Sequence, residues 1–320
     1  MRLLIALLAA SIALAAPASA QTYPDRTIKI IVPQPPGGGF DTVARILADK
    51  LGPLLGQTVI VENRTGAGTL VGTEAAARAP ADGYTLLLGA LSNIALNPGL
   101  YPNLSYDPLK DFTPVGLAVT WSYTLVARKD LPYKDLKEVI EFARANPEKI
   151  TFASAGRGSG QHIAMAVTAK LAGVSLTHVA YRGAQAAYQD ILGGRVDLFF
   201  DISSTARPQV DGGQVRALAV SSRERQPMHP DVPSVAETGV APLDMQSWFG
   251  LFAQSGVPPA ALERLRAEFA KVVASPEVAE LFGKTGGQVM KLSPAATEAL
   301  IKADVERWTK LIRDAGLTGG

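Results

Sequence analysis

Two kinds of hydrophobic pattern alternate along most of the chain. Short runs rich in β-branched residues predict strands, and stretches with apolar residues near a 3.6 period predict helices. The predicted strands are 27–32, 58–61, 84–89, 123–127, 150–153, 176–180, 196–200 and 215–220. The predicted helices among them are 40–55, 69–78, 133–145, 161–172 and 184–192. This alternation predicts an α/β fold with mostly parallel sheets.

The C-terminal part has a different pattern. An apolar strand over 248–253 precedes predicted helices over 258–274, 276–284 and 294–315. Pro276 and Pro294 each follow a serine, as is typical of a capped helix start. The strand-like segments 113–127 and 245–254 contain small or polar residues and are candidate hinges. If both cross between lobes, residues 21–120 plus 246–320 form lobe 1, and residues 121–245 form lobe 2.

The first predicted strand runs into Pro35-Pro36-Gly37-Gly38-Gly39, which can continue neither a β-ladder nor a helix. A helix follows from Phe40, with Asp41 in its first turn. Unhindered amide groups at a helix start favour a carboxylate or a phosphate. The spacing matches neither a dinucleotide fingerprint nor a P-loop. A tight turn that binds nothing is the alternative at this point.

Three later turns follow the same logic. Residues 154–160 join a strand to the helix that opens at Gln161 and His162, Tyr181-Arg182-Gly183 precedes the next helix, and residues 201–204 follow the strand after it. In open α/β sheets, ligands bind outside the carboxyl ends of the strands, where all four turns are expected. Free amides and small hydroxyls are therefore expected at the second turn too.

The N-terminus has the features of an export signal. Arg2 precedes the apolar run 3–16, and Ala18 and Ala20 fit a small-residue cleavage site, so residues 1–20 are interpreted as a signal peptide cleaved before Gln21. No later stretch is long and apolar enough to span a membrane. The apolar run itself is too short for a membrane anchor, the alternative interpretation.

Composition narrows the class of protein further. The chain has 320 residues and no cysteine, which excludes disulfides, thiol catalysis and a lipid-modified cysteine. Its formal net charge is +2, and no basic run indicates nucleic acid. The three histidines, His162, His178 and His229, lack metal-ligand spacing, so no metal site is expected, and no cofactor is indicated.

Taken in order, short motifs from residue 23 to 316 resemble the tripartite tricarboxylate receptor, or Bug-type, family of periplasmic solute-binding proteins. The residues that carry this resemblance are Tyr23-Pro24-Asp25-Arg26, Ile31-Val32-Pro33, Pro36-Gly37-Gly38 with Asp41, Val61-Glu62-Asn63-Arg64, Gly66-Ala67-Gly68, Asp82-Gly83-Tyr84, Tyr106-Asp107-Pro108, Lys110-Asp111-Phe112, Ser154-Ala155-Gly156 with Gly158-Ser159 and His162, His178-Val179, Tyr181-Arg182-Gly183, Asp197, Phe200-Asp201, Pro233-Ser234-Val235 with Glu237, and Ser247-Trp248-Phe249-Gly250.

The resemblance implies a two-lobed periplasmic binding protein of the type II, Venus-flytrap kind, with a cleft between α/β lobes. The receptor would be a periplasmic monomer without enzymatic activity that captures a small mono- or dicarboxylate, aliphatic or aromatic. Its partner would be an inner-membrane permease of large and small subunits. The family's ligand contacts carry over to Gln34, Gly37, Gly38, Gly39, Phe40, Asp41, Ser92, Asn93, Ser154, Ala155, Gly156, Ser159, His162, Gly183, Ala184 and Asp201.

Two of these positions depart from the commonest family pattern and bear on ligand identity. Gln34 stands where an aromatic residue is frequent, and Phe40 where a small polar residue is frequent. Other residues keep structural alternatives. His162 could serve only as a hydrogen-bond partner, Arg182 could be a surface residue rather than a bidentate carboxylate ligand, and Trp248 could be hinge packing.

Two other functions use the same cleft. A secreted hydrolase would need an activated serine, but Ser154 and Ser159 lack the G-x-S-x-G elbow, since Phe152 and Arg157 stand where its first glycine belongs. A triad through His162 remains formally open. Ligand-dependent docking on a membrane sensor is the third hypothesis, and the sequence does not separate it from transport.

Overall fold

The computed structural model describes residues 23–318, so the predicted signal peptide and its cleavage site lie outside the described residues. The strands are β1 (Ile28–Val32), β2 (Val59–Asn63), β3 (Thr85–Ala90), β4 (Phe112–Arg128), β5 (Thr151–Ser154), β6 (Thr177–Ala180), β7 (Leu198–Ile202), β8 (Val215–Val220), β9 (Gln246–Gln254) and β10 (Gln288–Val289). The helices are α2 (Gly39–Leu55), α3 (Leu70–Ala77), α4 (Asn97–Leu100), α5 (Leu136–Ala145), α6 (Gly160–Ala172), α7 (Ala184–Leu192), α8 (Ser203–Asp211), α9 (Pro259–Ala274), α10 (Pro276–Gly283), α11 (Pro294–Asp314) and the π-helix η1 (Leu91–Leu96).

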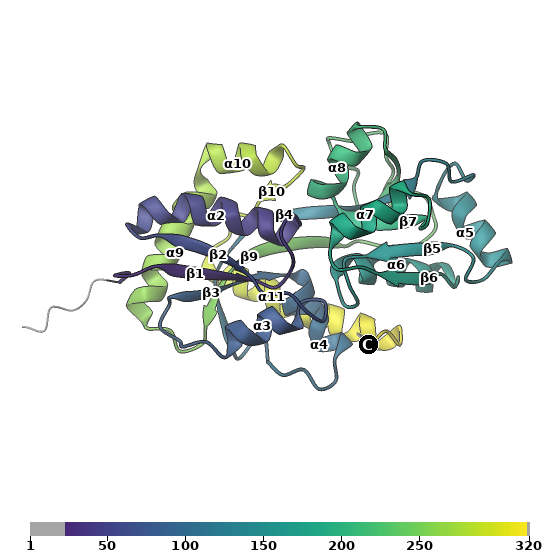
Figure 1. The fold of residues 1–320 in the computed structure, drawn as a ribbon. Coiled ribbons are helices and arrows are strands. Elements are labelled where there is room, and N and C mark those ends of the chain that lie inside the picture. Colours follow the sequence, from purple (N-terminus) through teal and green to yellow (C-terminus); the bar gives the residue numbers. More distant parts are fainter. Residues whose placement is uncertain (1–22, 319–320) are drawn as a thin grey trace, which may run out of the picture.

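One strand joins the two halves of the molecule (Figure 1). β4 is 17 residues long. Its residues 112–122 pair with β9, and its residues 123–128 pair with β7 and β8. We use lobe 1 for β1, β2, β3, β9, β10 and the helices packed on them, and lobe 2 for β5 to β8 with α5 to α8. The expected two-lobed α/β architecture is confirmed, while the exact boundaries at residues 120 and 245 stay a prediction.

Parallel pairing is confined to the outer strands of each lobe. β2, β1 and β3 are parallel in lobe 1, as are β6, β5 and β7 in lobe 2. The strands around β4 are antiparallel: β9 pairs with β3 and β4, and β8 pairs with β4. The outer strands therefore form the predicted strand–helix–strand units with parallel pairing. The two predicted hinge segments instead form an antiparallel pair at the centre.

Three helical elements were not predicted. α8, with the sequence SSTARPQVD, has few apolar residues and contains Pro208, so it lacks a helical hydrophobic period. The π-helix η1 and the short α4 follow β3 directly and are almost wholly buried. Ser92, Asn93, Asn97 and Pro98 interrupt the apolar residues of this short stretch, so its pattern does not identify a helix.

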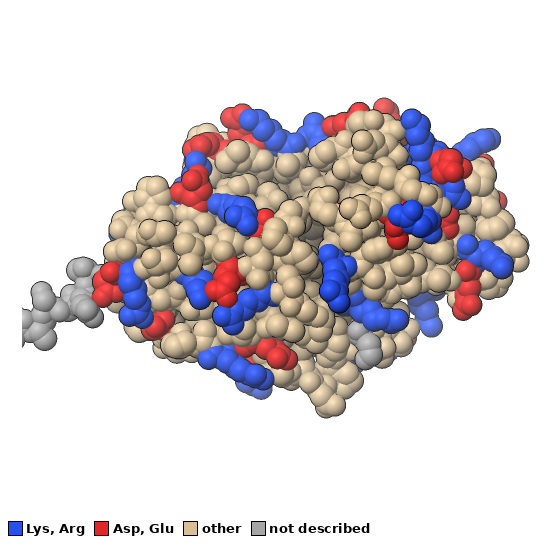
Figure 2. All heavy atoms as spheres, viewed as in Figure 1, with Lys and Arg blue, Asp and Glu red and all other residues tan. Residues whose placement is uncertain are grey.

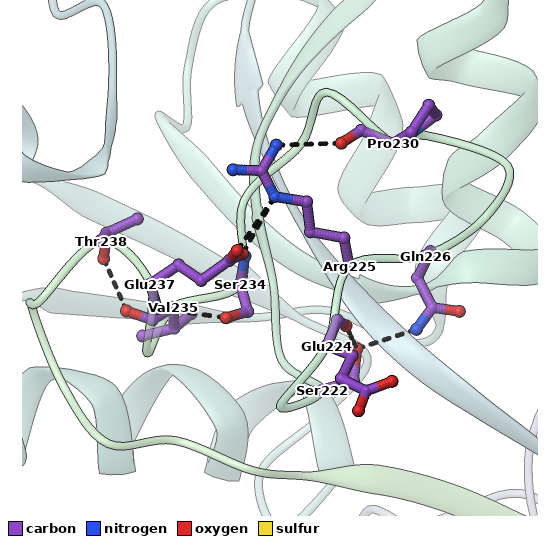
Figure 3. Close-up of polar contacts among 9 residues, drawn as sticks. All are labelled: Ser222, Glu224, Arg225, Gln226, Pro230, Ser234, Val235, Glu237 and Thr238. Carbon is purple, nitrogen blue, oxygen red and sulfur yellow. Dashed lines mark hydrogen bonds and ion pairs between the residues drawn. The ribbon is translucent and has the colours of Figure 1, made fainter.

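The chain returns from lobe 2 to lobe 1 through the segment between β8 and β9 (Figure 3). Arg225 Nε donates to both carboxylate oxygens of Glu237 at 3.1 Å, and its Nη1 donates to the Pro230 carbonyl at 3.0 Å. Glu237 also accepts from the Ser234 amide at 2.7 Å, while the Glu237 amide donates to Ser234 Oγ. That backbone donor, more than Arg225, lowers the pKa of Glu237. These contacts order the return segment without a helix or strand.

Glycines allow β4 and β9 to approach closely where they cross. A Cβ atom at Gly250 would lie 2.2 Å from the Gly116 carbonyl oxygen and 2.8 Å from Leu117 Cα. Next to this contact the Phe249 ring packs edge-on against Trp121, with ring centroids 5.5 Å apart. Backbone atoms cannot move aside as a flexible side chain can, so position 250 requires glycine.

We expect Gly250→Ala to destabilise the protein by roughly 1 to 3 kcal/mol, because the added methyl overlaps the backbone of the neighbouring strand. Urea unfolding followed by circular dichroism measures this change. Gly283→Ala is the control, since a Cβ there meets no atom within 4 Å. Equal midpoints for the two variants would contradict the close approach.

Candidate functional site

A small cavity of about 70 Å³ lies between the lobes, at the carboxyl ends of the parallel strands. Lobe 1 contributes the turn before α2, and lobe 2 contributes the turn before α7 together with α6 and the junction of β7 with α8. The lining residues are Gln34, Pro35, Pro36, Gly38, Gly39, Gln161, Arg182, Gly183, Ala184, Gln185, Asp201 and Thr205. The N-termini of α2 and α7 therefore face a common space.

Asp41 holds the lobe 1 turn in shape. Its carboxylate accepts hydrogen bonds from the Gly37 amide at 3.1 Å, from Arg45 Nε at 2.9 Å and from Asn63 Nδ2 at 3.1 Å. Asn63 Nδ2 also donates to the carbonyl of Gln34. Burial alone would raise the pKa of Asp41, but these hydrogen bonds outweigh burial and lower it. The amide of Gly37 is thus occupied, and α2 begins two residues later, at Gly39.

The lobes meet across the cavity at the turn before α7. Gly183 has a φ of 97°, a conformation that favours glycine, and it precedes the first residue of α7. A Cβ atom at Gly183 would lie 3.4 Å from Pro35 Cγ, and one at Gly37 would lie 3.9 Å from the Gln185 side chain. The amide groups of the first turn of each helix have no partner within the helix, so both ends favour negative charge.

The second glycine turn, 154–160, differs from the sequence expectation. The Gly156 amide donates to Ser154 Oγ, the Gly158 amide to His162 Nδ1, and the His162 amide to Ser159 Oγ. The expectation of free amides and hydroxyls at these positions is therefore wrong, because side chains of the turn itself cap them. This turn contacts lobe 1 instead: Cβ atoms built at Gly156 and Gly158 would lie 3.5 Å from Gly68 Cα and 2.6 Å from Tyr101 Oη.

Behind the second turn, two histidines stack in parallel. The rings of His162 and His178 lie 4.1 Å apart, and His178 Nε2 is 2.7 Å from the hydroxyl of Ser154. Burial is the main reason that the pKa of His162 falls to about 3 and that of His178 to about 4. The neighbouring His178 and then Arg157 lower the pKa of His162 further, and Arg157 lowers that of His178. Both rings are neutral at physiological pH, which suits their role in supporting the turn.

Asp201 is the buried charged residue of the cavity lining. It is the penultimate residue of β7, and its side chain is wholly shielded from solvent. Its Oδ1 accepts from the Ile202 amide at 2.8 Å, and its Oδ2 accepts from the hydroxyl of Thr205. Burial raises the pKa of Asp201 to about 6, although these hydrogen bonds favour the charged form.

The other predicted contacts are not among the residues that line the cavity. Phe40 packs edge-on against Phe249, with centroids 5.1 Å apart. Asn93 uses both ends of its amide within lobe 1, on the Ala90 amide and on Thr73 Oγ1. Ser92 and Ala155 are buried. The cavity lining thus contains Gln34, Gly38, Gly39, Gly183, Ala184 and Asp201 of the predicted set.

The sequence analysis did not predict several of the lining residues as ligand contacts. Gln161, Gln185 and Thr205 line the cavity, and Arg182, which was left open, does so too with an exposed side chain. One signal could have found two of them. Gln161 and Gln185 are the second residues of helices that follow glycine turns, where side chains lie beside the free amides.

Within residues 23–318, no group of histidine, aspartate and glutamate side chains could hold a metal ion. Over the same part of the chain, every helix is too short or too polar to cross a membrane. Figure 2 shows acidic and basic side chains interspersed over both lobes on the face it presents, in keeping with the small net charge.

Comparison with known proteins agrees with this architecture. Residues 43–317 match the tripartite tricarboxylate transporter family receptor. The periplasmic binding protein BugD is 36% identical in sequence and superposes with a TM-score of 0.87, covering 92% of this chain and 99% of that one. The chain therefore belongs to the tripartite tricarboxylate receptor family of periplasmic solute-binding proteins.

Two further structures contain ligands. Rpa4515 of R. palustris with adipate is 30% identical, with a TM-score of 0.88 over 92% of this chain and 99% of that chain. MatC from Rhodopseudomonas palustris with bound malate is 32% identical, with a TM-score of 0.86 over 91% of this chain and 100% of that chain. The likeness covers both lobes.

We expect Asp41→Asn to lower the free energy of unfolding at pH 7 by roughly 1 to 3 kcal/mol, because hydrogen bonds to a charged acceptor are lost. The folded pKa of Asp41 lies below its ordinary value of about 4. Its stabilisation is therefore full above that value and is lost as the pH falls through the folded pKa.

Urea unfolding at pH 7 and pH 3 measures this effect, and the gap between Asp41→Asn and wild type should narrow at pH 3. Asp231→Asn is the control, since that residue is exposed. A gap that stays constant with pH would show that the charge of Asp41 does not hold the turn.

Proposed function

We propose that this protein captures a small mono- or dicarboxylate, aliphatic or aromatic, in the cavity between its lobes. The supporting observation is that the N-termini of α2 and α7, from different lobes, face one space lined by Gly38, Gly39 and Gly183. Glycines let the ligand approach the backbone, and the amide groups favour a carboxylate without a salt bridge. The adipate and malate held by Rpa4515 and MatC support the same class of ligand.

The same proposal covers delivery and location. The mature receptor, cleaved before Gln21, would work in the periplasm as a monomer and pass its ligand to an inner-membrane permease of the tripartite type. The alternative is that the ligand-bound, closed form of the protein docks on a membrane sensor. In either case lobe closure would report ligand binding to the partner, because a ligand that touches both lobes binds the closed form better than the open one.

The hydrolase hypothesis finds no support in the site. Ser154 is fully buried, and its hydroxyl contacts His178 rather than His162. The other ring nitrogen of His178 is buried without a hydrogen-bond partner, so no carboxylate orients the ring as a catalytic triad requires. We therefore propose a receptor without catalytic turnover. Ligand recovered after incubation with the protein should be chemically unchanged, and a new product would contradict this.

We expect wild-type protein to bind at least one small carboxylate, which can be found by thermal-shift screening. A ligand at about 100 times its Kd adds roughly 2.7 kcal/mol of stability. Gly38→Val should weaken binding at least tenfold by filling the cavity, yet leave unliganded stability nearly unchanged, since a Cβ at Gly38 meets no atom within 4 Å. A shift with sugars or cations but with no carboxylate would overturn the proposed ligand class.

We expect the ligand to compact wild-type protein, as measured by the radius of gyration in small-angle scattering. Gly158→Leu should reduce both compaction and affinity, because its side chain would strike Tyr101 of lobe 1. Gly173→Leu is the matched control: Gly158 has a φ of 77° and Gly173 one of 66°, but a Cβ at Gly173 meets no atom within 4 Å. Tight binding by wild type without compaction would favour a preformed pocket instead.

A further inference from the structure

A hydrogen bond joins the two lobes outside the cavity. α8 of lobe 2 and α10, which packs on α9 and β10 of lobe 1, lie on the same edge of the molecule (Figure 1). Arg207 of α8 donates through Nη1 to the carbonyl oxygen of Lys284, the residue that follows the last turn of α10. The last carbonyl groups of a helix have no partner within the helix and carry partial negative charge. A guanidinium group from the opposite lobe is therefore a favourable donor at this position.

Both partners of this hydrogen bond are held in place by their own lobe. Arg207 Nε donates to Asp211 Oδ2 at 3.1 Å, one turn further along α8, and Asp211 Oδ1 is 3.0 Å from Nε2 of His229 in the return segment. The ammonium group of Lys284 pairs with Glu280 at 2.8 Å within α10. The guanidinium group is therefore oriented toward the carbonyl oxygen, and the lysine charge beside it is neutralised.

The acceptor belongs to a loop, residues 284–287, that is fixed at the centre of the molecule. Trp121 Nε1 of β4 donates to the carbonyl of Thr285 at 3.1 Å. A Cβ atom at Gly286 would lie 2.3 Å from Cε of Met228 in the return segment. The loop thus rests on the strand that both lobes share, whereas Arg207 is carried by a helix of lobe 2.

The helix that carries Arg207 also forms part of the cavity wall. α8 begins at Ser203, directly after β7, and Thr205 in its first turn lines the cavity. Arg207 lies two residues further on and is not among the lining residues. A hydrogen bond weakens steeply outside a narrow range of distances and angles. A rotation of lobe 2 that opens the cavity would therefore move α8 and break the contact between Arg207 and Lys284.

We propose that Arg207 stabilises the closed form from outside the cavity and so raises the affinity for every ligand by the same factor, without touching any of them. An interaction that exists only in the closed form increases the fraction of molecules that are closed, and the observed affinity scales with that fraction. The inference rests on the proposed capture of a carboxylate by lobe closure. It goes beyond that function by assigning a determinant of affinity to a residue that does not line the site.

Calorimetric titration at pH 7.5 tests the proposal with malate, adipate and benzoate as probes. Arg207→Met keeps an unbranched apolar side chain and removes the charge and the donors. Each probe that binds wild-type protein should bind this variant about three- to tenfold more weakly, by the same factor for each, as is typical of the loss of one partly exposed hydrogen bond. Arg207→Lys keeps a charged donor and should recover part of the affinity.

Arg195→Met is the matched control. Arg195 also pairs with an aspartate of its own lobe, and its hydrogen bonds, to Asp190 and to the carbonyl of Gln189, lie within lobe 2. Its affinity for each probe should equal that of wild type. Unchanged affinity in Arg207→Met would overturn the proposal. A loss confined to one probe would overturn it too, because that result would indicate direct contact with the ligand.

A distance measurement separates control of closure from a merely structural role of Arg207. The chain has no cysteine, so spin labels can be attached at Asp49→Cys on α2 and Gln189→Cys on α7, which are exposed positions in opposite lobes. In pulsed electron resonance, unliganded Arg207→Met should populate the longer separation more than wild type does, and saturating ligand should restore the shorter one. Identical distance distributions for the two unliganded proteins would contradict the proposal.

The outcomes also distinguish this inference from the proposed function. If no carboxylate of the thermal-shift screen binds wild-type protein, capture of a carboxylate fails, while the distances between labels in unliganded protein still decide the role of Arg207. If the probes bind and Arg207→Met matches wild type in affinity and in label distances, capture stands and only the role of Arg207 is overturned.

Discussion

The two lobes depend on one shared strand. β4 pairs with β9 and β10 over its first part and with β7 and β8 over its last, so a single run of backbone hydrogen bonds belongs to both lobes. The close approach of Gly250 to the backbone of β4 fixes this centre. Because the parallel strands of both lobes extend outward from it, their carboxyl ends, with the glycine turns and helix starts that follow, are brought to the same cavity.

The turns that meet there differ in what their backbone groups do. At the lobe 1 turn, Asp41 accepts a hydrogen bond from the Gly37 amide and leaves the amide groups at the start of α2 open. At the second turn, side chains of the turn itself accept hydrogen bonds from the backbone amides, and its glycines pack against Gly68 and Tyr101. The first kind of turn is suited to a ligand, and the second to contact between lobes. The same local sequence pattern therefore supports two separate tasks.

The carboxyl group of Asp201 in the cavity lining has hydrogen bonds but no ion pair among the described residues, and its burial disfavours the charged form. Arg182 lines the rim but is exposed, whereas Asp201 is wholly buried with neutral donors. The ion pairs of Asp41 with Arg45 and of Glu237 with Arg225 support the lobe 1 turn and the return segment and do not line the cavity. Helix dipoles and one buried carboxyl group therefore dominate the electrostatics of the site.

The sequence by itself determined the repeated strand, turn and helix units, because their hydrophobic periods and glycine turns are local properties. The bounds of β8 and α7 agree with prediction to the residue, and the turns before α2 and α7 both line the cavity. The family resemblance, carried by motifs along the whole chain, is likewise confirmed.

Only the tertiary structure decided which turns face each other. The local pattern predicts the same role for the second turn as for the first, but its Gly156 and Gly158 amides donate to Ser154 and His162 instead. The antiparallel pairing of β4 with β9 joins segments more than a hundred residues apart, which no local period encodes. The raised pKa of Asp201 has the same origin, since burial is set by the elements that pack around a side chain and not by its neighbours in sequence.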